Sequence, residues 1–282
     1  MIFAQSKKEK SIVIIVYWFG KFPWYYYYFL HSCRYNPTVD FIIISDNQSV
    51  THLPKNVYFI KKSPEEIRQL ASKNLEYNVT LEPQPYKFCD FRPAFGVVFQ
   101  DYIKDYTFWG HGDLDIIFGN IRNFITDEIL DKFDVISLRH DYLSSWFALY
   151  RNNIKINYLY KQSRDYQRVF ANSTYYNFDE TNFTFKVFSD GHPYFQITSE
   201  IESMTHLIKR LSEENYIKAY FDLHAIEGIT GNIEWSKGQL IYKDKYEFIL
   251  YHLLELKRIF KPKTITKKIP QTFYIDHNKI NF

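Results

Sequence analysis

Residues 86–119 read YKFCDFRPAFGVVFQDYIKDYTFWGHGDLDIIFG and contain the motif around which the other motifs of the chain are arranged. Its centre is Asp113 and Asp115, separated by Leu114. Side chains alternate along a strand, so both carboxylates would point to one side and Leu114 to the other. Two converging carboxylates favour a hard divalent cation such as Mg²⁺ or Mn²⁺. The spacing predicts a metal site, although a solvated acidic turn gives the same pattern.

The composition is that of a globular protein, and 282 residues are enough to bury a large core. A net charge of +3 and the lack of any nucleic-acid motif argue against nucleic-acid binding. Cys33 and Cys89 offer no disulfide framework, which favours a reducing compartment. The apolar stretch 12–19 is too short for a membrane span or a signal peptide. We therefore expect a cytoplasmic protein.

The first part of the chain predicts a parallel α/β sheet, because strand-like apolar runs alternate with helices. Strands are expected over 12–18, 40–45 and 57–60. Helices are expected over 24–33 and from Ser63, where Ser63 and Glu66 match a capping box. Ligands of such sheets bind beyond the carboxyl ends of the strands. The residues expected there, as nucleotide contacts or as core aromatics, are Tyr17, Trp18, Phe19, Ser45 and Asp46.

Further elements are expected after residue 85. A helix over 86–102 contains Gly96, which costs roughly 1 kcal/mol against Ala, so we expect a close approach of the chain there. The remaining expected elements are strands over 106–110, 134–138 and 144–150, helices over 121–129, 156–168 and 200–215, and a hairpin over 232–242. Lysines interleaved with apolar residues form a basic C-terminal tail over 261–282.

Several motifs occur in an order that is more specific than the Asp-x-Asp pair. They are IVIIVYWFGKFP, PYKFCDFRPAFG, FWGHGDLDIIFG, LYRNN, NFDE, IEWSKGQL and YHLLELKR. With this set the chain resembles the bacterial GT-A-fold glycosyltransferases of polysaccharide loci over nearly its whole length. The resemblance implies an α/β, GT-A (Rossmann-like) fold, in which helices flank a mixed, mainly parallel sheet with a C-terminal acceptor-side extension. It implies a single catalytic domain over 1–260, with a nucleotide-binding half over about 10–140 and an acceptor-side half over about 141–260.

The resemblance implies donor-binding roles for charged residues upstream of the Asp-x-Asp pair. Lys87, Asp90 and Arg92 would hold the hydroxyls or phosphates of the donor, together with Asp113. The order of these residues is similar to that of retaining α-glycosyltransferases. The Asp-to-Arg spacing is shorter than in the family pattern, which weakens the expectation of retained configuration.

The resemblance also implies how the metal site is completed. Asp113, Asp115 and His252 would bind Mn²⁺ or Mg²⁺, and a satisfied buried histidine is the alternative for His252. Lys257 would contact the diphosphate, with Arg258 as the other available cation.

The Asn-Phe-Asp-Glu motif supplies the candidate catalytic carboxylates, Asp179 and Glu180. One of them would stabilise the sugar cation or act as a nucleophile in a retaining enzyme, or act as general base in an inverting one. A solvated acidic turn is the alternative. On the acceptor side we expect His111, Trp146 and Arg151, and Trp235 is either a sugar platform or core.

The resemblance implies an enzyme that transfers a hexose from a nucleotide sugar, with UDP as the expected nucleotide, to a saccharide or lipid-linked acceptor in the synthesis of lipopolysaccharide, O-antigen or capsule. The basic tail would either contact an anionic cytoplasmic leaflet or be solvated and partly disordered. Two other classes stay open. They are a metal-dependent phosphohydrolase or nucleotidyltransferase, and a non-catalytic carbohydrate-binding protein.

Overall fold

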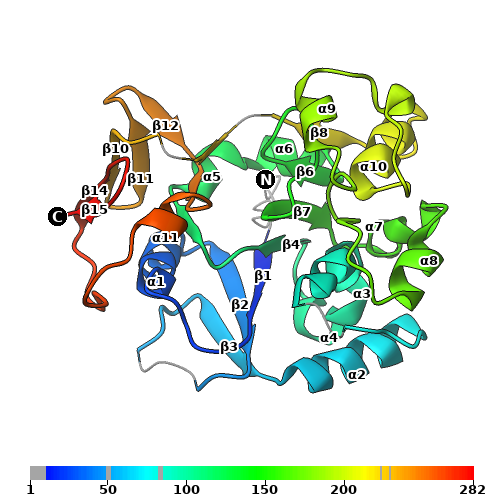
Figure 1. The fold of residues 1–282 in the computed structure, drawn as a ribbon, viewed down its shortest axis with the longest axis horizontal. Helices are drawn as coiled ribbons and strands as arrows, with labels where there is room; N and C mark the ends of the chain where they lie inside the picture. Colours follow the sequence, from blue (N-terminus) through cyan, green and yellow to red (C-terminus); the bar gives the residue numbers. More distant parts are fainter. Residues whose placement is uncertain (1–10, 49–51, 82–84, 223, 229) are drawn as a thin grey trace, which may run out of the picture.

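The structure is a computed structural model, and it describes residues 11–48, 52–81, 85–222, 224–228 and 230–282 (Figure 1). No helix among these residues is both long and apolar enough to cross a membrane.

The main sheet has seven strands in the order β3-β2-β1-β4-β7-β6-β8. They are β1 (Ile12–Trp18), β2 (Val39–Ser45), β3 (Val57–Lys61), β4 (Phe108–Gly112), β6 (Val135–Ser137), β7 (Phe147–Arg151) and β8 (Ala219–Phe221). The first four strands in this order run parallel, whereas β7 is antiparallel to both of its neighbours. The prediction of a mixed, mainly parallel α/β sheet is therefore confirmed.

Both faces of the main sheet are buried, which explains why its strands are continuous apolar runs. In β1, Ile14 packs into one hydrophobic cluster and Ile15 into another. The first cluster includes residues of α1 (Tyr26–Arg34) and of the smaller sheets. The second includes residues of α2 (Pro64–Leu75) and of the helical segments that follow residue 85. The predicted capping box of α2 is present, since the side chain of Ser63 accepts from the Glu66 amide while Glu66 accepts from the Ser63 amide.

The segment predicted as one helix over 86–102 has a different structure. It is a 3₁₀ helix, η1 (Pro85–Ala94), followed by the short helices α3 (Phe95–Val98) and α4 (Gln100–Ile103). Pro93 lies inside η1 and has no amide hydrogen to donate to a continuous α-helix. The close approach expected at Gly96 is confirmed, because a β-carbon there would lie 2.7 Å from Asn157 Oδ1 and 2.7 Å from Trp109 Nε1.

Other predicted helices are also broken into shorter pieces. The expected helix over 121–129 is α5 (Ile121–Phe124) and α6 (Asp127–Lys132), and that over 156–168 is α7 (Ile154–Asn157), η2 (Leu159–Gln162) and α8 (Tyr166–Ala171). Asn120 and Asn153 cap α5 and α7 with their side-chain oxygens. The remaining helical elements are α9 (Phe185–Ser189), η3 (Tyr194–Gln196), α10 (Met204–Glu213) and α11 (Leu256–Ile259).

Two smaller sheets complete the fold. Strands β5 (Ile116–Phe118), β13 (Leu250–His252) and β9 (Ala225–Glu227) form one of them. The other has the order β12-β11-β10-β14-β15 and lies at the opposite end of the molecule from α7, α8 and α10 (Figure 1). Its strands are β10 (Ile233–Ser236), β11 (Gln239–Tyr242), β12 (Tyr246–Phe248), β14 (Thr272–Ile275) and β15 (Ile280–Asn281), so the hairpin predicted over 232–242 is present.

The expectation of a partly disordered C-terminal tail is wrong for residues 272–281. Strand β14 pairs with both β10 and β15. Phe273 and Ile275 are fully buried, and the ring of Phe273 stacks on Trp235 at 5.0 Å between centroids. The tail is therefore part of the folded molecule, and Trp235 is a core residue rather than a sugar platform.

Candidate metal and active site

The Asp-x-Asp pair lies in the turn between β4 and β5, not within a strand. The Asp113 amide donates to the Trp146 carbonyl on the neighbouring chain segment, at 3.1 Å. Leu114 is buried in the core and anchors the turn. The expected strand alternation is wrong, yet the turn still brings both carboxylates to the same place.

His252 meets this turn because β13 pairs antiparallel with β5, which puts His252 opposite Ile116, next to Asp115. One ligand atom each of Asp113, Asp115 and His252 lies within 4.8 Å of the others. The imidazole Nε2 is 3.3 Å from Asp115 Oδ2. Two carboxylate oxygens and one imidazole nitrogen suit Mn²⁺ well, and Mg²⁺ accepts the oxygens. The three predicted ligands thus converge into a set that fits a divalent cation.

Charge balance in the cluster is set by cationic side chains. The Lys257 ammonium forms an ion pair with Asp115. Burial alone would raise the pKa of Asp115, but His252 and Lys257 outweigh it and hold that pKa below its usual range. Burial likewise disfavours a charged His252, but Asp115 and Glu227 outweigh it and raise the pKa of His252 to about 10. A metal ion at this site would therefore displace a proton from His252.

Lys257 and Arg258 differ in their surroundings. The side chain of Lys257 is 30% exposed and reaches Asp115 at the edge of the cluster. Arg258 points to solvent and pairs with Glu255 at 3.2 Å. Only Lys257 is thus brought to the cluster.

Arg92 connects the turn to the Asn-Phe-Asp-Glu segment. Its guanidinium forms an ion pair with Asp113 at 2.5 Å, donates to the Ser145 carbonyl at 2.6 Å and lies 3.5 Å from Asp179. The side chain is 5% exposed. A guanidinium held in three directions is a fixed positive charge beside the cluster.

Asp179 and Glu180 are buried, so the alternative of a solvated acidic turn is wrong. Apart from the Arg92 ion pair, neither carboxylate oxygen of Asp179 has a hydrogen-bond donor among the described residues. Burial raises the pKa of Asp179 well above its usual value. Glu180 accepts from the Ser145 amide at 3.2 Å and from Asn177 Nδ2 at 3.1 Å, and burial raises its pKa to about 7.

Lys87 and Asp90 are bonded to each other and to the backbone, which does not fit their expected donor-binding role. Both side chains are fully buried and pair with each other at 3.0 Å. The Lys87 ammonium also donates to the carbonyls of Val169 and Thr174, so all three of its hydrogens are used. The Asp90 carboxylate accepts from the backbone amides at 176 and 178. The pair holds the segment that leads to Asp179.

The predicted acceptor-side residues are not exposed together. Trp146 is buried and packs on His252, with 5.4 Å between ring centroids. His111 is buried, and burial together with Arg92 holds its pKa well below the usual value. Arg151 pairs with Asp134 at 3.0 Å and lies opposite Phe108, at the far end of β4 from the turn. Arg151 is a structural residue, and its predicted role at the acceptor is wrong.

The residues expected at the carboxyl ends of β1 and β2 lie at the same edge of the sheet as the Asp-x-Asp turn, because β1 runs parallel to β4. The hydroxyl of Tyr17 accepts from Arg92 at 3.3 Å and lies 2.9 Å from Cys89 Sγ. Trp18 and Phe19 are half-buried and follow it along the strand. Asp46 is exposed and accepts from the Gly20 amide at 2.8 Å. Ser45 is buried, so the edge presents aromatic rings rather than this hydroxyl.

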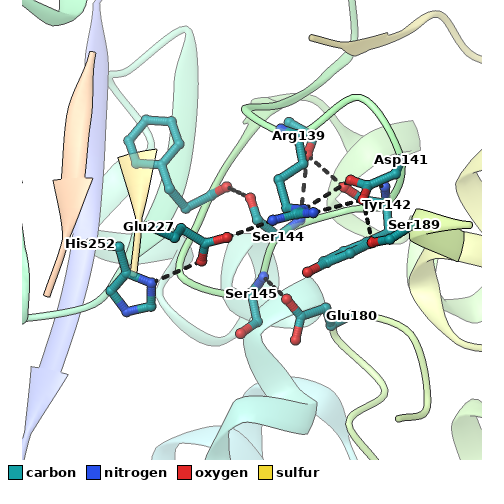
Figure 2. Close-up of polar contacts among 11 residues, drawn as sticks. Arg139, Asp141, Tyr142, Ser144, Ser145, Glu180, Ser189, Glu227 and His252 are labelled. Carbon is teal, nitrogen blue, oxygen red and sulfur yellow. Dashed lines mark hydrogen bonds and ion pairs between the residues drawn. The ribbon is translucent and has the colours of Figure 1, made fainter. Parts of the chain in front are cut away.

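Glu227 and Arg139 were not predicted from the sequence. Figure 2 shows Glu227 between His252 and Arg139, and Arg139 next to Asp141. The Nδ1 atom of His252 donates to Glu227 at 3.2 Å. Predicting Glu227 would have required recognising that β9 pairs with β13. Each of these strands has only three residues, which is too few to show a periodicity in the sequence.

A search among curated proteins found no match to this chain. A comparison with protein-family models gave a match over residues 14–282 to DUF6625, which is described as a family of unknown function. Because the match covers nearly the whole chain, the protein belongs to the family DUF6625.

Proposed function

We propose that this protein is a metal-dependent glycosyltransferase with a GT-A-like fold, which transfers a hexose from a nucleotide diphosphate sugar, UDP-linked, to a saccharide or lipid-linked acceptor. The observation that carries the proposal is the convergence of Asp113, Asp115 and His252 at the carboxyl edge of a mainly parallel sheet. Ligands of such sheets bind at this edge. Asp115 and Glu227 would also satisfy His252 as a buried histidine, so the proposal rests on the second carboxylate, Asp113, which converges with Asp115 and His252.

The leaving diphosphate needs positive charge. Mn²⁺ or Mg²⁺ held by the three ligands would supply Lewis acidity to the diphosphate oxygens. Arg92 is fixed by its contacts to Ser145 and Asp179 and stays in place. Lys257 is partly exposed, and among the described residues its ionic partner is Asp115. Lys257 is therefore free to move onto a phosphate once the metal neutralises that carboxylate.

The buried carboxylates give the chemistry at the sugar. In transfer, the bond from the anomeric carbon to the diphosphate breaks, a bond to the acceptor oxygen forms, and the acceptor proton moves to a base. Asp179 stabilises the sugar cation, or forms a covalent intermediate, if configuration is retained. Glu180, whose pKa is about 7, accepts the proton if configuration is inverted.

The acceptor and location belong to the same proposal. Synthesis of lipopolysaccharide, O-antigen or capsule at the cytoplasmic face of a membrane would bring a lipid-linked saccharide to the enzyme. Exposed lysines in the segment 261–268 would contact the anionic leaflet there.

The deciding experiment incubates the protein with UDP-glucose and UDP-galactose, Mn²⁺ and a panel of oligosaccharide and lipid-linked acceptors. We expect UDP release that depends on acceptor and is lost with EDTA or in Asp115→Asn. The matched control is Asp101→Asn, which changes an exposed carboxylate on α4. UDP release that ignores both acceptor and Asp115→Asn would overturn the proposal in favour of a phosphohydrolase.

Binding separates the enzyme from a carbohydrate-binding protein. A ligand that binds the native state raises its apparent stability, so a thermal-shift panel of UDP-sugars reports binding without turnover. We expect stabilisation by a UDP-sugar only when Mn²⁺ is present. Sugar binding that is indifferent to EDTA would favour a non-catalytic protein.

A further inference from the structure

We infer that Glu227 and Arg139 are positioning residues for the metal site, which hold the His252 ring so that its Nε2 faces the two carboxylates. The inference rests on the metal site of the proposed function. Neither residue belongs to the ligand set. Glu227 meets Nδ1 of His252 whereas Asp115 meets Nε2, and Figure 2 shows Arg139 beyond Glu227.

The backbone brings Glu227 to the histidine. Strands β9 and β13 are parallel neighbours, and His252 lies opposite Glu227 in their register. The two ring nitrogens are then divided between two carboxylates, with Nδ1 at 3.2 Å from Glu227 and Nε2 at 3.3 Å from Asp115. A hydrogen bond at one nitrogen fixes which nitrogen is available to a metal. The hydrogen bond from Nδ1 to Glu227 therefore leaves Nε2 as the nitrogen that can bind the cation.

Arg139 fixes Glu227 in turn. Its Nη1 is 2.5 Å from the second carboxylate oxygen of Glu227. Its Nε and Nη2 donate to the two oxygens of Asp141 at 2.9 and 2.6 Å, and its guanidinium lies 4.1 Å from the centroid of the Tyr142 ring. A planar guanidinium clamped by one carboxylate and an aromatic face leaves its remaining N–H in a set direction. Glu227 thus has one oxygen committed to Arg139 and one to His252.

Asp141 is the outer end of this chain and accepts from Ser189 Oγ at 2.7 Å. It also lines a surface pocket of about 450 Å³ with residues of α9 and α10. The order of contacts leading to the metal ligand is therefore Asp141, Arg139, Glu227 and His252. If this series of contacts positions His252, a substitution should weaken metal binding most at Glu227, less at Arg139 and least at Asp141. If the contacts only stabilise the fold, the substitutions should lower stability without this order in metal affinity.

The test measures Mn²⁺ binding directly by electron paramagnetic resonance, with pulsed detection of the ¹⁴N coupling from a bound imidazole. Glu227→Gln keeps the shape but offers one acceptor oxygen to two donors. We expect it to weaken Mn²⁺ binding by roughly 10–100-fold, the range for outer-shell partners of metal ligands, and to reduce the ¹⁴N coupling. Arg139→Lys and Asp141→Asn should weaken binding by successively smaller factors.

Two comparisons keep the inference separate from the proposed function. Glu247→Gln changes a half-buried glutamate of β12 that bonds to Asn123 and should leave Mn²⁺ binding unchanged. Asp115→Asn should weaken binding yet keep the ¹⁴N coupling, because His252 remains. Wild-type affinity and coupling in Glu227→Gln, with binding lost in Asp115→Asn, would overturn the inference alone. Wild-type binding in both variants would overturn the metal site itself. If Glu227→Gln does not fold, unchanged affinity in both Arg139→Lys and Asp141→Asn overturns the inference.

Discussion

At the scale of single residues, the candidate site consists of side chains in which acidic and basic groups alternate. Asp179, Arg92 and Asp113 form one such series, and Asp115, His252 and Glu227 form another. A cationic neighbour favours the charged form of a buried carboxylate and burial disfavours it. The cations outweigh burial at Asp115, whereas burial outweighs Arg92 at Asp179, and Glu180 has no ion pair among the described residues. The raised pKa of Glu180 has a measurable effect on stability.

Glu180 should make the protein less stable as pH rises. Its pKa is about 7 in the folded protein, against the usual 4.5, so the folded state binds more protons than the unfolded state between these values. The free energy of unfolding therefore falls as pH rises through this window, by on the order of 3 kcal/mol from this residue. Glu180→Gln should flatten the slope between pH 5 and pH 8, measured by urea denaturation. Asp179 contributes a slope of the same sign, so some dependence remains. Parallel profiles for the two proteins would contradict the prediction.

The pair of Lys87 and Asp90 gives a second prediction at this scale. Lys87→Met leaves a fully buried carboxylate without its cation, which costs about 3–5 kcal/mol of unfolding free energy. The matched control is Lys186→Met, where Lys186 pairs with Asp190 four residues away but is 85% exposed. Removing that pair should change stability by less than about 1 kcal/mol. Equal losses in the two variants would show that burial of the first pair does not matter.

At the scale of elements, sequence patterns predicted best where a local rule decides the structure. The capping box at Ser63 and Glu66 is such a rule, because the contacts that begin α2 lie within four residues. The segment over 86–102 was mispredicted because its apolar residues suit either a helix or buried irregular structure. Its conformation is set by distant contacts, such as that of Lys87 with the Val169 carbonyl, which leave no local signal.

Gly96 connects that segment to β4 and α7 and should not tolerate a side chain. Trp109 Nε1 donates to Asn157 Oδ1 at 2.7 Å, and a β-carbon on residue 96 would lie 2.7 Å from both atoms. Gly96→Ala gains roughly 1 kcal/mol of helix propensity, but forced overpacking costs about 1–3 kcal/mol and disturbs this hydrogen bond. We expect a net loss of unfolding free energy by chemical denaturation. Gln100→Ala, at an exposed position of α4, should stay within about 0.5 kcal/mol of wild type. A stabilised Gly96→Ala would mean that the contact relaxes at no cost.

At the scale of the whole molecule, the sequence predicted which residues meet better than it predicted how. Asp113, Asp115 and His252 were expected together and do converge, although through a turn and a strand pairing that no pattern indicated. Arg151 was expected with them but lies at the other end of β4. The order of the motifs along the chain was therefore enough to indicate the metal ligands. It was not enough to show at which end of a strand a residue lies, because that depends on how the strands pair.

The C-terminal strands also change how contact with a membrane can be tested. Deleting the chain after Phe260 would remove both β14 and β15 from the five-stranded sheet and expose Trp235, so lost binding could reflect lost folding. Replacing lysines in this segment tests membrane contact without removing the strands. Lys263, Lys267 and Lys268 are exposed and form no ion pair with a residue that the structure describes.

The triple change of these three lysines to Gln should weaken binding to phosphatidylserine vesicles while leaving the fold intact. Each lysine near such a surface contributes about 1 kcal/mol, so three substitutions should reduce the partition coefficient by roughly a hundredfold. Vesicle sedimentation measures the change, and circular dichroism checks the fold. A control with the same net charge replaces Lys104, Lys132 and Lys186, which are also exposed but lie on other elements. Equal weakening in both proteins would show that net charge rather than the C-terminal segment directs binding, and unchanged binding in the first would remove this segment from any membrane contact.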